Sequence, residues 1–380
     1  MQTVGLVKKL DRLLGPLAAA LLARVHPLPS RGSMPHELKS VLFIRPGGIG
    51  DAVLLTPVIH ALKKVFPHVT VELLVERRNH AVFGLCSEVD RIFCYDRPKE
   101  LFAVLRRSYD VVIDTEQWYR LSAVVTRLVR SPMKVGFATN ERCRMFTHPV
   151  PCSQDCYEAE CFFRLLGPLG IAGDVMPAGE TLRVSNDARQ QAASMLSDAL
   201  QQPVLALFPS ASIPEKRWDL EKFRKLVAWC ANHGLQVVIL GGRHDRALGG
   251  QIAEGQKVLN LAGLTSIAES AAVLEQAAVV VSGDSGLLHL ASLLGRPTVS
   301  LFGPSNATKW APSGPDHIVL NKNLPCSPCT RFGNMPKCPI GVRCLQEITA
   351  EEVMVAVMTL LHRNAGRMTT DVPKKCDQEG

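Results

Sequence analysis

The chain has 380 residues, of which 47% are hydrophobic and 21% are charged, and its formal net charge is +8. A chain of this size can bury one large core or, more in keeping with ordinary domain sizes, two. The first 33 residues hold five basic residues against one acid and so supply half of the net charge, which favours an anionic membrane surface as a partner and argues against nucleic acid.

The amino-terminal residues 4–25 predict an amphipathic helix. Leucines recur there at helical spacing, and Lys8, Lys9 and Arg12 lie beside them. The longest apolar run, residues 13–23, is too short to span a bilayer, and its charged flanks without a cleavage pattern indicate no secretory signal. Either a membrane surface or the body of the protein can hold this helix. Residues 1–36 are therefore predicted to be an extension and a linker.

A strand, a loop and a helix follow the linker. Residues 41–44 form a short apolar run, 46–50 a glycine loop, and 51–65 a helical pattern that begins at Asp51. Asp51 can cap the first amides of that helix. The loop fits neither the dinucleotide fingerprint nor the lysine-containing phosphate loop, so neither a nicotinamide nor an ATP site is indicated.

Strands and helices alternate through the first half of the chain, which predicts a parallel sheet. The further strands expected there are 69–75, 91–95, 111–114 and 134–137. Arg120, Arg127 and Arg130 lie on or just after one predicted helix at spacings of seven and three, so we expect them to share a face. That face is either solvated or a patch that binds a phosphorylated acceptor.

A second alternating series begins at residue 204. Its expected strands are 204–208, 236–240, 258–261, 279–282 and 298–302. The chain therefore predicts two doubly wound, Rossmann-like α/β domains, over residues 37–185 and 186–365, and a polar tail over 366–380. Ligands of such paired domains usually bind in the cleft between them.

The turn at residues 283–286 follows the carboxyl end of an apolar strand and leads into an apolar helix. Open α/β sheets bind ligands at such turns, and unpaired amides at a helix start favour anions, so we expect a phosphate-bearing ligand. Alternatively, Ser285 only caps the helix and Asp284 closes the turn. Lys216 and Arg217 follow another strand and can meet the same phosphates.

Twelve cysteines in a chain without an export signal indicate thiols in a reducing compartment. Four of them lie close together near the carboxyl terminus, at Cys326, Cys329, Cys338 and Cys344. These four are candidates for a structural zinc or iron–sulfur site, although the later spacings match no standard pattern. Disulfides or free thiols are the alternatives.

Three blocks of the sequence together resemble glycosyltransferase family 9, the heptosyltransferases that build the lipopolysaccharide core. They are RPGGIGDAVLLTPVIHALK at 45–63, PSASIPEKRWDLEKF at 209–223 and SGDSGLLHLASLLGRPTVSLFGPSNATKWAP at 282–312. The resemblance implies a two-domain GT-B fold, a nucleotide-sugar donor, ADP-heptose in particular, a glycolipid acceptor, and inversion at the transferred carbon. It also implies a cytoplasmic enzyme that is peripheral on the inner membrane.

Within this resemblance, Asp51 matches the acidic residue proposed as the base that activates the acceptor hydroxyl. Lys216 matches a basic residue thought to contact the phosphates of the donor. The block D-[TS]-G-L-x-H-L around the donor is matched by Asp284, Ser285, Gly286, Leu287 and His289. His289 binds either the ligand or the facing strand. From its place after a strand of the second domain, Asp245 is expected to meet the nucleoside.

The sequence contains no D-x-D pair, which is the usual carboxylate clamp for a metal-bound diphosphate. We therefore predict transfer that requires no metal or other cofactor. The competing hypothesis is a nucleotide-sugar or glycolipid binding protein in which the cysteine segment senses metal or redox state. An epimerase on a similar scaffold is disfavoured by the missing dinucleotide fingerprint.

Overall fold

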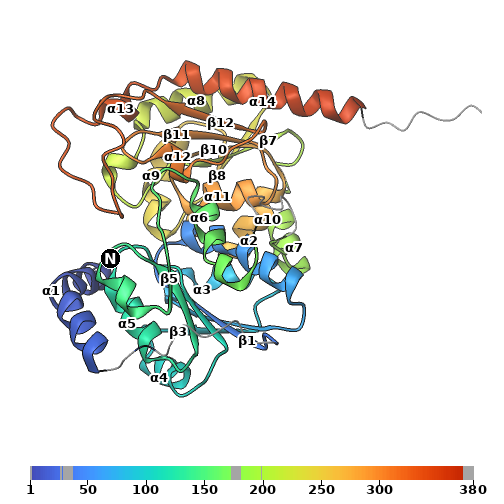
Figure 1. The fold of residues 1–380 in the computed structure, drawn as a ribbon. Helices are drawn as coiled ribbons and strands as arrows, with labels where there is room; N and C mark the ends of the chain where they lie inside the picture. The colour runs from blue at the N-terminus through green and yellow to red at the C-terminus, as the bar shows by residue number, and fades with distance from the viewer. Residues whose placement is uncertain (1, 26–27, 29–36, 173–180, 198, 371–380) are drawn as a thin grey trace, which may run out of the picture. The chain divides into compact units, whose positions relative to one another are not determined.

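The computed structural model describes residues 2–25, 28, 37–172, 181–197 and 199–370 (Figure 1). They form two compact units. Unit 1 contains the described residues up to 185 together with the short segments 308–310 and 331–334, and unit 2 contains the others. The predicted linker 26–36, apart from residue 28, and residues 371–380 of the predicted tail lie outside the described residues.

Unit 1 is built on a parallel six-stranded sheet with the strand order β3-β2-β1-β4-β5-β6. Its strands are β1 (Ser40–Arg45), β2 (Thr70–Val75), β3 (Arg91–Cys94), β4 (Val111–Asp114), β5 (Met133–Phe137) and β6 (His148–Val150). In β1, every residue after Ser40 is buried, as expected of a central strand covered on both faces. This is the doubly wound order that the alternation predicts, with β6 as a strand that the sequence pattern does not reveal.

The helices of unit 1 connect these strands. They are α1 (Gln2–Val25), α2 (Ile49–Val65), α3 (Arg77–Phe83), α4 (Pro98–Leu105), α5 (Arg120–Leu128) and α6 (Glu158–Arg164), with 3-10 turns η1 (Glu141–Met145) and η2 (Gly167–Leu169). The helix expected from Asp51 onward begins at Ile49, with Gly48 as its N-cap. Asp51 therefore lies in the first turn of α2, at the carboxyl edge of the sheet.

The amino-terminal helix α1 packs against α5 and η1 (Figure 1). Its packing face contains the buried residues Asp11 and Ala19, and a Cβ on Gly15 would lie 2.9 Å from Cδ of Arg120. The other face is apolar and exposed, at Leu13, Leu14, Leu17, Leu21 and Val25. The prediction that the helix contacts the body of the protein is thus met by one face, while membrane contact by the other stays a prediction.

Unit 2 repeats the architecture with a second parallel six-stranded sheet, in the order β12-β11-β10-β7-β8-β9. Its strands are β7 (Val204–Phe208), β8 (Gln236–Ile239), β9 (Val258–Asn260), β10 (Ala277–Gly283), β11 (Thr298–Phe302) and β12 (His317–Asn321). Five of these correspond to predicted strands. The edge strand β12 is the addition; its apolar run is only three residues long, and none of its five residues is buried.

The later helices are α7 (Asn186–Met195), α8 (Leu220–Asn232), α9 (Arg246–Ala253), α10 (Ile267–Glu275), α11 (Gly286–Leu293), α12 (Ala307–Trp310), α13 (Arg343–Gln346) and α14 (Ala350–Thr370), with 3-10 turns η3 (Pro214–Lys216) and η4 (Arg243–Asp245). Apolar side chains of α8 and α14, such as Phe223 and Val357, share one core with Val281 and Val299 of the central strands. The last helix continues into the predicted tail as far as Thr370. Among the described helices, none has the length and apolar character needed to cross a bilayer.

Candidate functional site

The loop after β1 brings a carboxylate and a guanidinium close together in unit 1. Gly48 donates its N–H to Oδ2 of Asp51 at 3.2 Å, so Asp51 caps the start of α2, as its position allows. Gly47 has a φ of +122°, and a Cβ there would lie 2.8 Å from Nη2 of Arg45 and 3.5 Å from Oδ2 of Asp51. Because glycine has no Cβ, it leaves the space between the two charged groups open.

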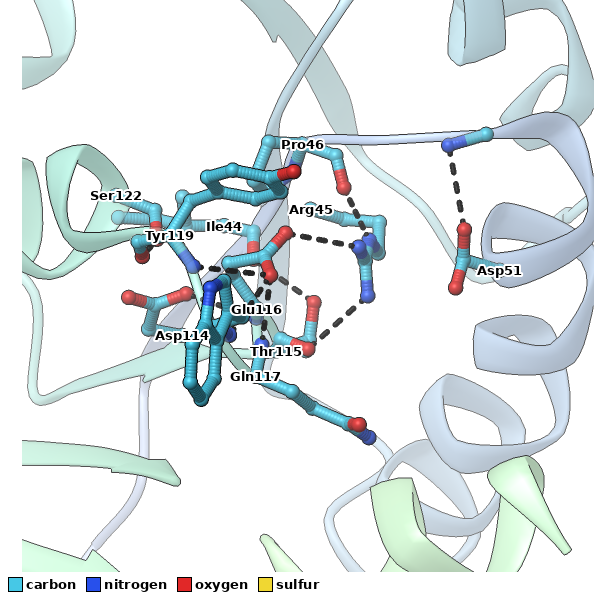
Figure 2. Close-up of polar contacts among 12 residues, drawn as sticks. Ile44, Arg45, Pro46, Asp51, Asp114, Thr115, Glu116, Gln117, Tyr119 and Ser122 are labelled. Carbon is cyan, nitrogen blue, oxygen red and sulfur yellow. Dashed lines mark hydrogen bonds and ion pairs between the residues drawn. The ribbon is translucent and has the colours of Figure 1, made fainter. Parts of the chain in front are cut away.

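Arg45, the last residue of β1, is 4% exposed and its guanidinium is held at three points. Nε donates to the carbonyl oxygen of Pro46 at 2.6 Å, Nη1 donates to that of Thr115 at 3.0 Å, and Nη2 lies 3.5 Å from the Glu116 carboxylate (Figure 2). Burial lowers the pKa of Arg45, but the charges of Asp51 and Glu116 outweigh it, so the pKa is raised from its ordinary value. A fixed positive charge therefore lies beside Asp51.

Glu116 follows β4, the neighbour of β1 in the sheet. Its Oε1 accepts the N–H groups of Gln117 and Trp118, each at 2.9 Å, and so orients the chain that leads into α5 (Figure 2). Beside it, Asp114 and Arg142 form a fully buried ion pair at 2.8 Å. Burial raises the pKa of Asp114 even though the arginine opposes the change. These contacts gather buried and nearly buried charged side chains at the carboxyl edge of the unit 1 sheet.

A further buried carboxylate, Glu158 at the start of α6, is close enough to Asp51 for the Asp51 charge to raise its pKa. Nε2 of Gln117 donates to both carboxylate oxygens of Glu158, at 2.8 and 2.9 Å, and Nζ of Lys309 lies 2.8 Å from it. All of these residues belong to unit 1. Burial raises the pKa of Glu158 to about 7; Lys309 opposes the rise and Asp51 adds to it. Perturbed carboxyl groups are enriched at functional sites, which marks this edge as a candidate.

The three arginines predicted to share a face do not form one basic patch. The side chain of Arg120 is 13% exposed and bonds to Glu141 through Nε at 2.8 Å and Nη2 at 2.7 Å. Arg127 is buried, and burial lowers its pKa. Arg130 is exposed and lies beyond the helix, because Val129 is already extended, with ψ 137°. The shared-face prediction is therefore wrong for Arg130, which has left the helical spacing, and tertiary packing buries Arg127. Binding of an acceptor by these arginines stays a prediction.

In unit 2, the turn after β10 holds a polar cluster. Oδ2 of Asp284 accepts a hydrogen bond from Nζ of Lys216 at 2.7 Å and from Oγ of Ser305 at 2.6 Å. Burial raises the pKa of Asp284, but Lys216 and Ser305 outweigh it and the net change is a lowering. The structure thus brings the predicted residues Asp284 and Lys216 into contact. Sequence reasoning missed their partner Ser305.

The remaining predicted donor residues lie on either side of this cluster. Ser285 is the N-cap of α11, where its Oγ accepts the N–H of Leu288 at 3.2 Å, so the capping alternative describes its contact in the structure. Gly286 begins the helix, and Leu287 and His289 on it are buried. Asp245 caps the turn η4, since its Oδ2 accepts the N–H of Gly242 at 2.8 Å. Ligand contacts by these residues stay predictions.

Comparison with known proteins shows what kind of protein has these two sites. Residues 99–338, more than half of the chain, match the family model described as glycosyltransferase family 9 (heptosyltransferase). The chain belongs to this family. The resemblance inferred from the three sequence blocks is therefore confirmed.

Individual relatives of this family 9 chain are distant. Lipopolysaccharide heptosyltransferase 3 of Escherichia coli (strain K12) is 26% identical over 347 residues, covering 83% of this chain and 96% of that protein. The solved structure of the family 9 glycosyl transferase from Veillonella parvula has a TM-score of 0.72 at 21% identity, covering 87% of this chain and 99% of that one. For E. coli ADP-heptose lipopolysaccharide heptosyltransferase II, the TM-score is 0.71 at 21% identity, covering 86% and 99%. These likenesses confirm the predicted GT-B fold.

The four carboxyl-terminal cysteines of this glycosyltransferase are free thiols. Burial raises the pKa of Cys344, and the neighbouring Cys329, Cys326 and Cys338 raise it further. Nevertheless, the described part of the chain contains no group of three or more His, Cys, Asp or Glu side chains arranged to hold a metal ion. A zinc or iron–sulfur site there stays a prediction that needs a rearrangement of these thiols. The disulfide in unit 1, Cys156–Cys161, is one that the sequence analysis does not predict.

Sequence reasoning missed Arg45, Glu116 and Glu158 as members of the unit 1 site. A usable signal exists for the first two, because Arg45 ends one buried strand, Glu116 follows its neighbour, and adjacent parallel strands end at one edge of the sheet. Glu158 carries no such signal. Its partner Lys309 lies 151 residues further along the chain, so only the folded structure joins them.

Proposed function

We propose that the protein is an inverting glycosyltransferase that moves heptose from ADP-heptose to a lipopolysaccharide-core or other glycolipid acceptor. Family membership supports transfer of a sugar, and the names of the relatives support heptose and the lipopolysaccharide core. The observation that carries the proposal is that Lys216 contacts Asp284 at 2.7 Å beside the start of α11, because a lysine and the amides of a helix start are groups that bind phosphates.

The proposed reaction is a direct displacement. Asp51 accepts the proton of the acceptor hydroxyl, whose oxygen forms a bond to the anomeric carbon as the bond from that carbon to the diphosphate oxygen breaks. The nucleoside diphosphate leaves with the electron pair of the broken bond. Lys216 and the amides at the start of α11 stabilise the negative charge that develops on it. Attack from the face opposite the leaving group inverts the configuration of the transferred carbon.

Metal independence is part of this proposal. The sequence has no D-x-D pair, and Lys216 supplies a positive charge that a diphosphate-bound metal would otherwise provide. We expect turnover in EDTA to equal turnover in magnesium. Activity that EDTA abolishes and magnesium restores would contradict the proposal.

The decisive experiment measures ADP release from ADP-heptose with a heptose-free lipopolysaccharide-core acceptor. Asn also caps helices but cannot take up the proton, so Asp51→Asn should keep the thermal shift produced by ADP and lose about 10²–10⁴-fold in kcat. The matched control is Asp155→Asn, which neutralises an exposed acid of unit 1. Donor binding without transfer by the native protein would favour the nucleotide-sugar binding protein instead.

We infer that the protein is peripheral on the cytoplasmic face of the inner membrane and that α1 contacts the bilayer. Leu13, Leu17 and Leu21 are 66–73% exposed on one face of α1, and soluble proteins rarely leave such a row uncovered. Basic residues of the same segment complement anionic lipid headgroups. Replacing the three leucines with serine should abolish sedimentation with anionic phospholipid vesicles. Unchanged sedimentation would refute this placement.

A further inference from the structure

A disulfide bond of unit 1 encloses the start of α6. Cys156 and Cys161 are bonded across a separation of five positions, so the loop that they close contains Tyr157 and the first turn of the helix. Tyr157 is the N-cap of α6 and makes no side-chain cap. The disulfide therefore constrains a helix start that lacks the usual side-chain cap.

Glu158 connects this loop to the unit 1 site. Gln117 and Lys309 contact its carboxylate at 2.8–2.9 Å, and Nζ of Lys309 also donates to the carbonyl oxygen of Ser153 at 3.3 Å. The charge of Asp51 is among the causes that raise the pKa of Glu158, so the two carboxyl groups interact. A shift in the first turn of α6 would therefore move a buried carboxyl group close to the proposed base.

The surroundings of Cys161 suit a thiol as well as a disulfide. Its Sγ lies 3.6 Å from the carbonyl oxygen of Ser153 and 3.9 Å from that of Cys156. A disulfide sulfur has no hydrogen to donate to these oxygens, whereas a thiol donates its S–H. The reduced pair therefore finds hydrogen-bond acceptors already in place, and both redox states are compatible with the packing around α6.

The two cysteines differ in their access to solvent. Cys156 is 8% exposed and lies in the segment 151–157, which has neither helix nor strand, whereas Cys161 on α6 is 1% exposed. An attacking thiol therefore reaches Cys156 first. Disulfides of cytosolic proteins are mostly transient or redox-sensing, because glutathione keeps other thiols reduced. In a cytoplasmic protein, a bond at this place is better explained as reversible than as permanent.

We propose that Cys156 and Cys161 form a reversible redox switch, which low-molecular-weight thiols and their disulfides open and close, and that its state determines how firmly Glu158 is held in the unit 1 site. Its effect on turnover rests on the proposed transferase function. The redox chemistry and its effect on α6 are independent of transfer.

Opening of the switch is a thiol–disulfide exchange. The thiolate of a low-molecular-weight thiol attacks Sγ of Cys156 and forms a bond to it, while the bond to Cys161 breaks and its electron pair goes to Cys161, which takes up a proton. A second thiol then attacks the mixed disulfide, releases the low-molecular-weight disulfide and leaves Cys156 as a thiol. The protein gains two electrons and two protons, and the two low-molecular-weight thiols lose them.

The first test follows the bond in the native full-length protein. The protein is equilibrated in mixtures of reduced and oxidised glutathione and then unfolded in N-ethylmaleimide, and its peptides are mapped by mass spectrometry. Cys156 and Cys161 should gain the label together as reduced glutathione increases, and should lose it when oxidised glutathione is restored. A bond that persists in reduced glutathione, or a pair that is labelled in every mixture, would overturn the inference. So would a bond to Cys152, whose Sγ lies 3.9 Å from the carbonyl oxygen of Ser153.

The second test compares the reduced and oxidised protein. Reduction should speed hydrogen exchange in the peptide that spans residues 157–164 and lower the melting temperature by about 5 °C, because the closed loop is lost. At a temperature well below melting, kcat should fall about tenfold, since small misplacements near reacting groups are costly. A disulfide that only stabilises the fold would leave that kcat unchanged.

Variants separate the pair from the other thiols. The double variant Cys156→Ser, Cys161→Ser should behave like the reduced native protein in both buffers, whereas the matched control Cys143→Ser removes an exposed free thiol of unit 1 and should respond as the native protein does. If the double variant does not fold, the native comparison decides alone. Exchange at 157–164 and kcat that both ignore the redox state would overturn the inference. A protein inactive in both buffers contradicts the proposed function, while labelling and exchange still decide on the switch.

Discussion

Removal of the Asp11 carboxylate tests whether α1 is a structural part of unit 1. Oδ1 of Asp11 accepts the N–H groups of Arg120 and Leu121, each at 2.7 Å, and its side chain is 1% exposed. These two amides begin α5, whose own N-cap Tyr119 makes no side-chain cap. A residue 109 positions earlier in the chain therefore caps this helix. Asp11→Ala leaves both amides without that acceptor.

The expected loss follows from these contacts. Each hydrogen bond to a charged group contributes about 1.5–3 kcal/mol. Burial, which raises the pKa of Asp11, offsets part of that gain. Loss of an N-cap alone costs about 0.5–2 kcal/mol, so we expect Asp11→Ala to lower the free energy of unfolding of unit 1 by about 2–4 kcal/mol. Asp11→Asn keeps one acceptor oxygen and should cost about 1 kcal/mol.

The assay combines urea denaturation with hydrogen exchange of the peptide that spans residues 119–128. Faster exchange at the start of α5 should accompany the loss of stability in Asp11→Ala, while exchange in the strands of unit 2 stays unchanged. Asp155→Ala serves as the control, because it removes an exposed acid from the same unit. A change below about 0.5 kcal/mol with native exchange at residues 119–123 would refute the capping role, since such values are typical of surface substitutions.

Further predictions concern buried charges, close packing and the cysteine segment. The pKa of Glu158 is raised from 4.5 to about 7, so its contribution to the free energy of unfolding is fully present below pH 4.5 and is lost as the pH rises through 7. The loss should amount to about 3 kcal/mol. Glu158→Gln should remove this pH dependence of stability. The pKa of Asp284 is lowered, so its contribution to the free energy of unfolding is lost as the pH falls into the acid range. At pH 7, Asp284→Asn should lower the free energy of unfolding by about 2 kcal/mol, less than the loss of a partner in a fully buried ion pair. The same variant should weaken ADP binding in calorimetry. A Cβ on Gly136 would lie 2.3 Å from Cζ of Phe146, so Gly136→Ala should lower the melting temperature through a loss of about 1–3 kcal/mol. Metal analysis of protein purified without oxygen should find about one zinc or iron–sulfur site per chain if the four thiols of segment 326–344 rearrange around it, and a metal-free active protein would refute that site.

Local pattern in the sequence was sufficient for the class of fold and for two members, Asp284 and Lys216, of the polar cluster in unit 2. Runs such as Val41–Ile44 and Val279–Ser282 are apolar because central parallel strands are buried on both faces, so alternation with helices predicts the two sheets. Asp51 and Asp284 could be singled out because the carboxyl ends of such strands lie at known places in the fold. The family blocks added their expected roles.

Only the tertiary structure decided which side chains meet across long stretches of chain. Asp11 with the start of α5, Glu158 with Lys309, and Trp118 with Phe332 are pairs whose members are separated by more than a hundred residues, and no local periodicity records such contacts. The arginines show the converse, since helical spacing places Arg120 and Arg127 on one side of α5, but packing buries one and pairs the other with Glu141. The spacing of residues in the sequence determines the side of a helix or strand on which a side chain lies. Whether that side chain is buried or paired depends on which other parts of the chain pack on that side.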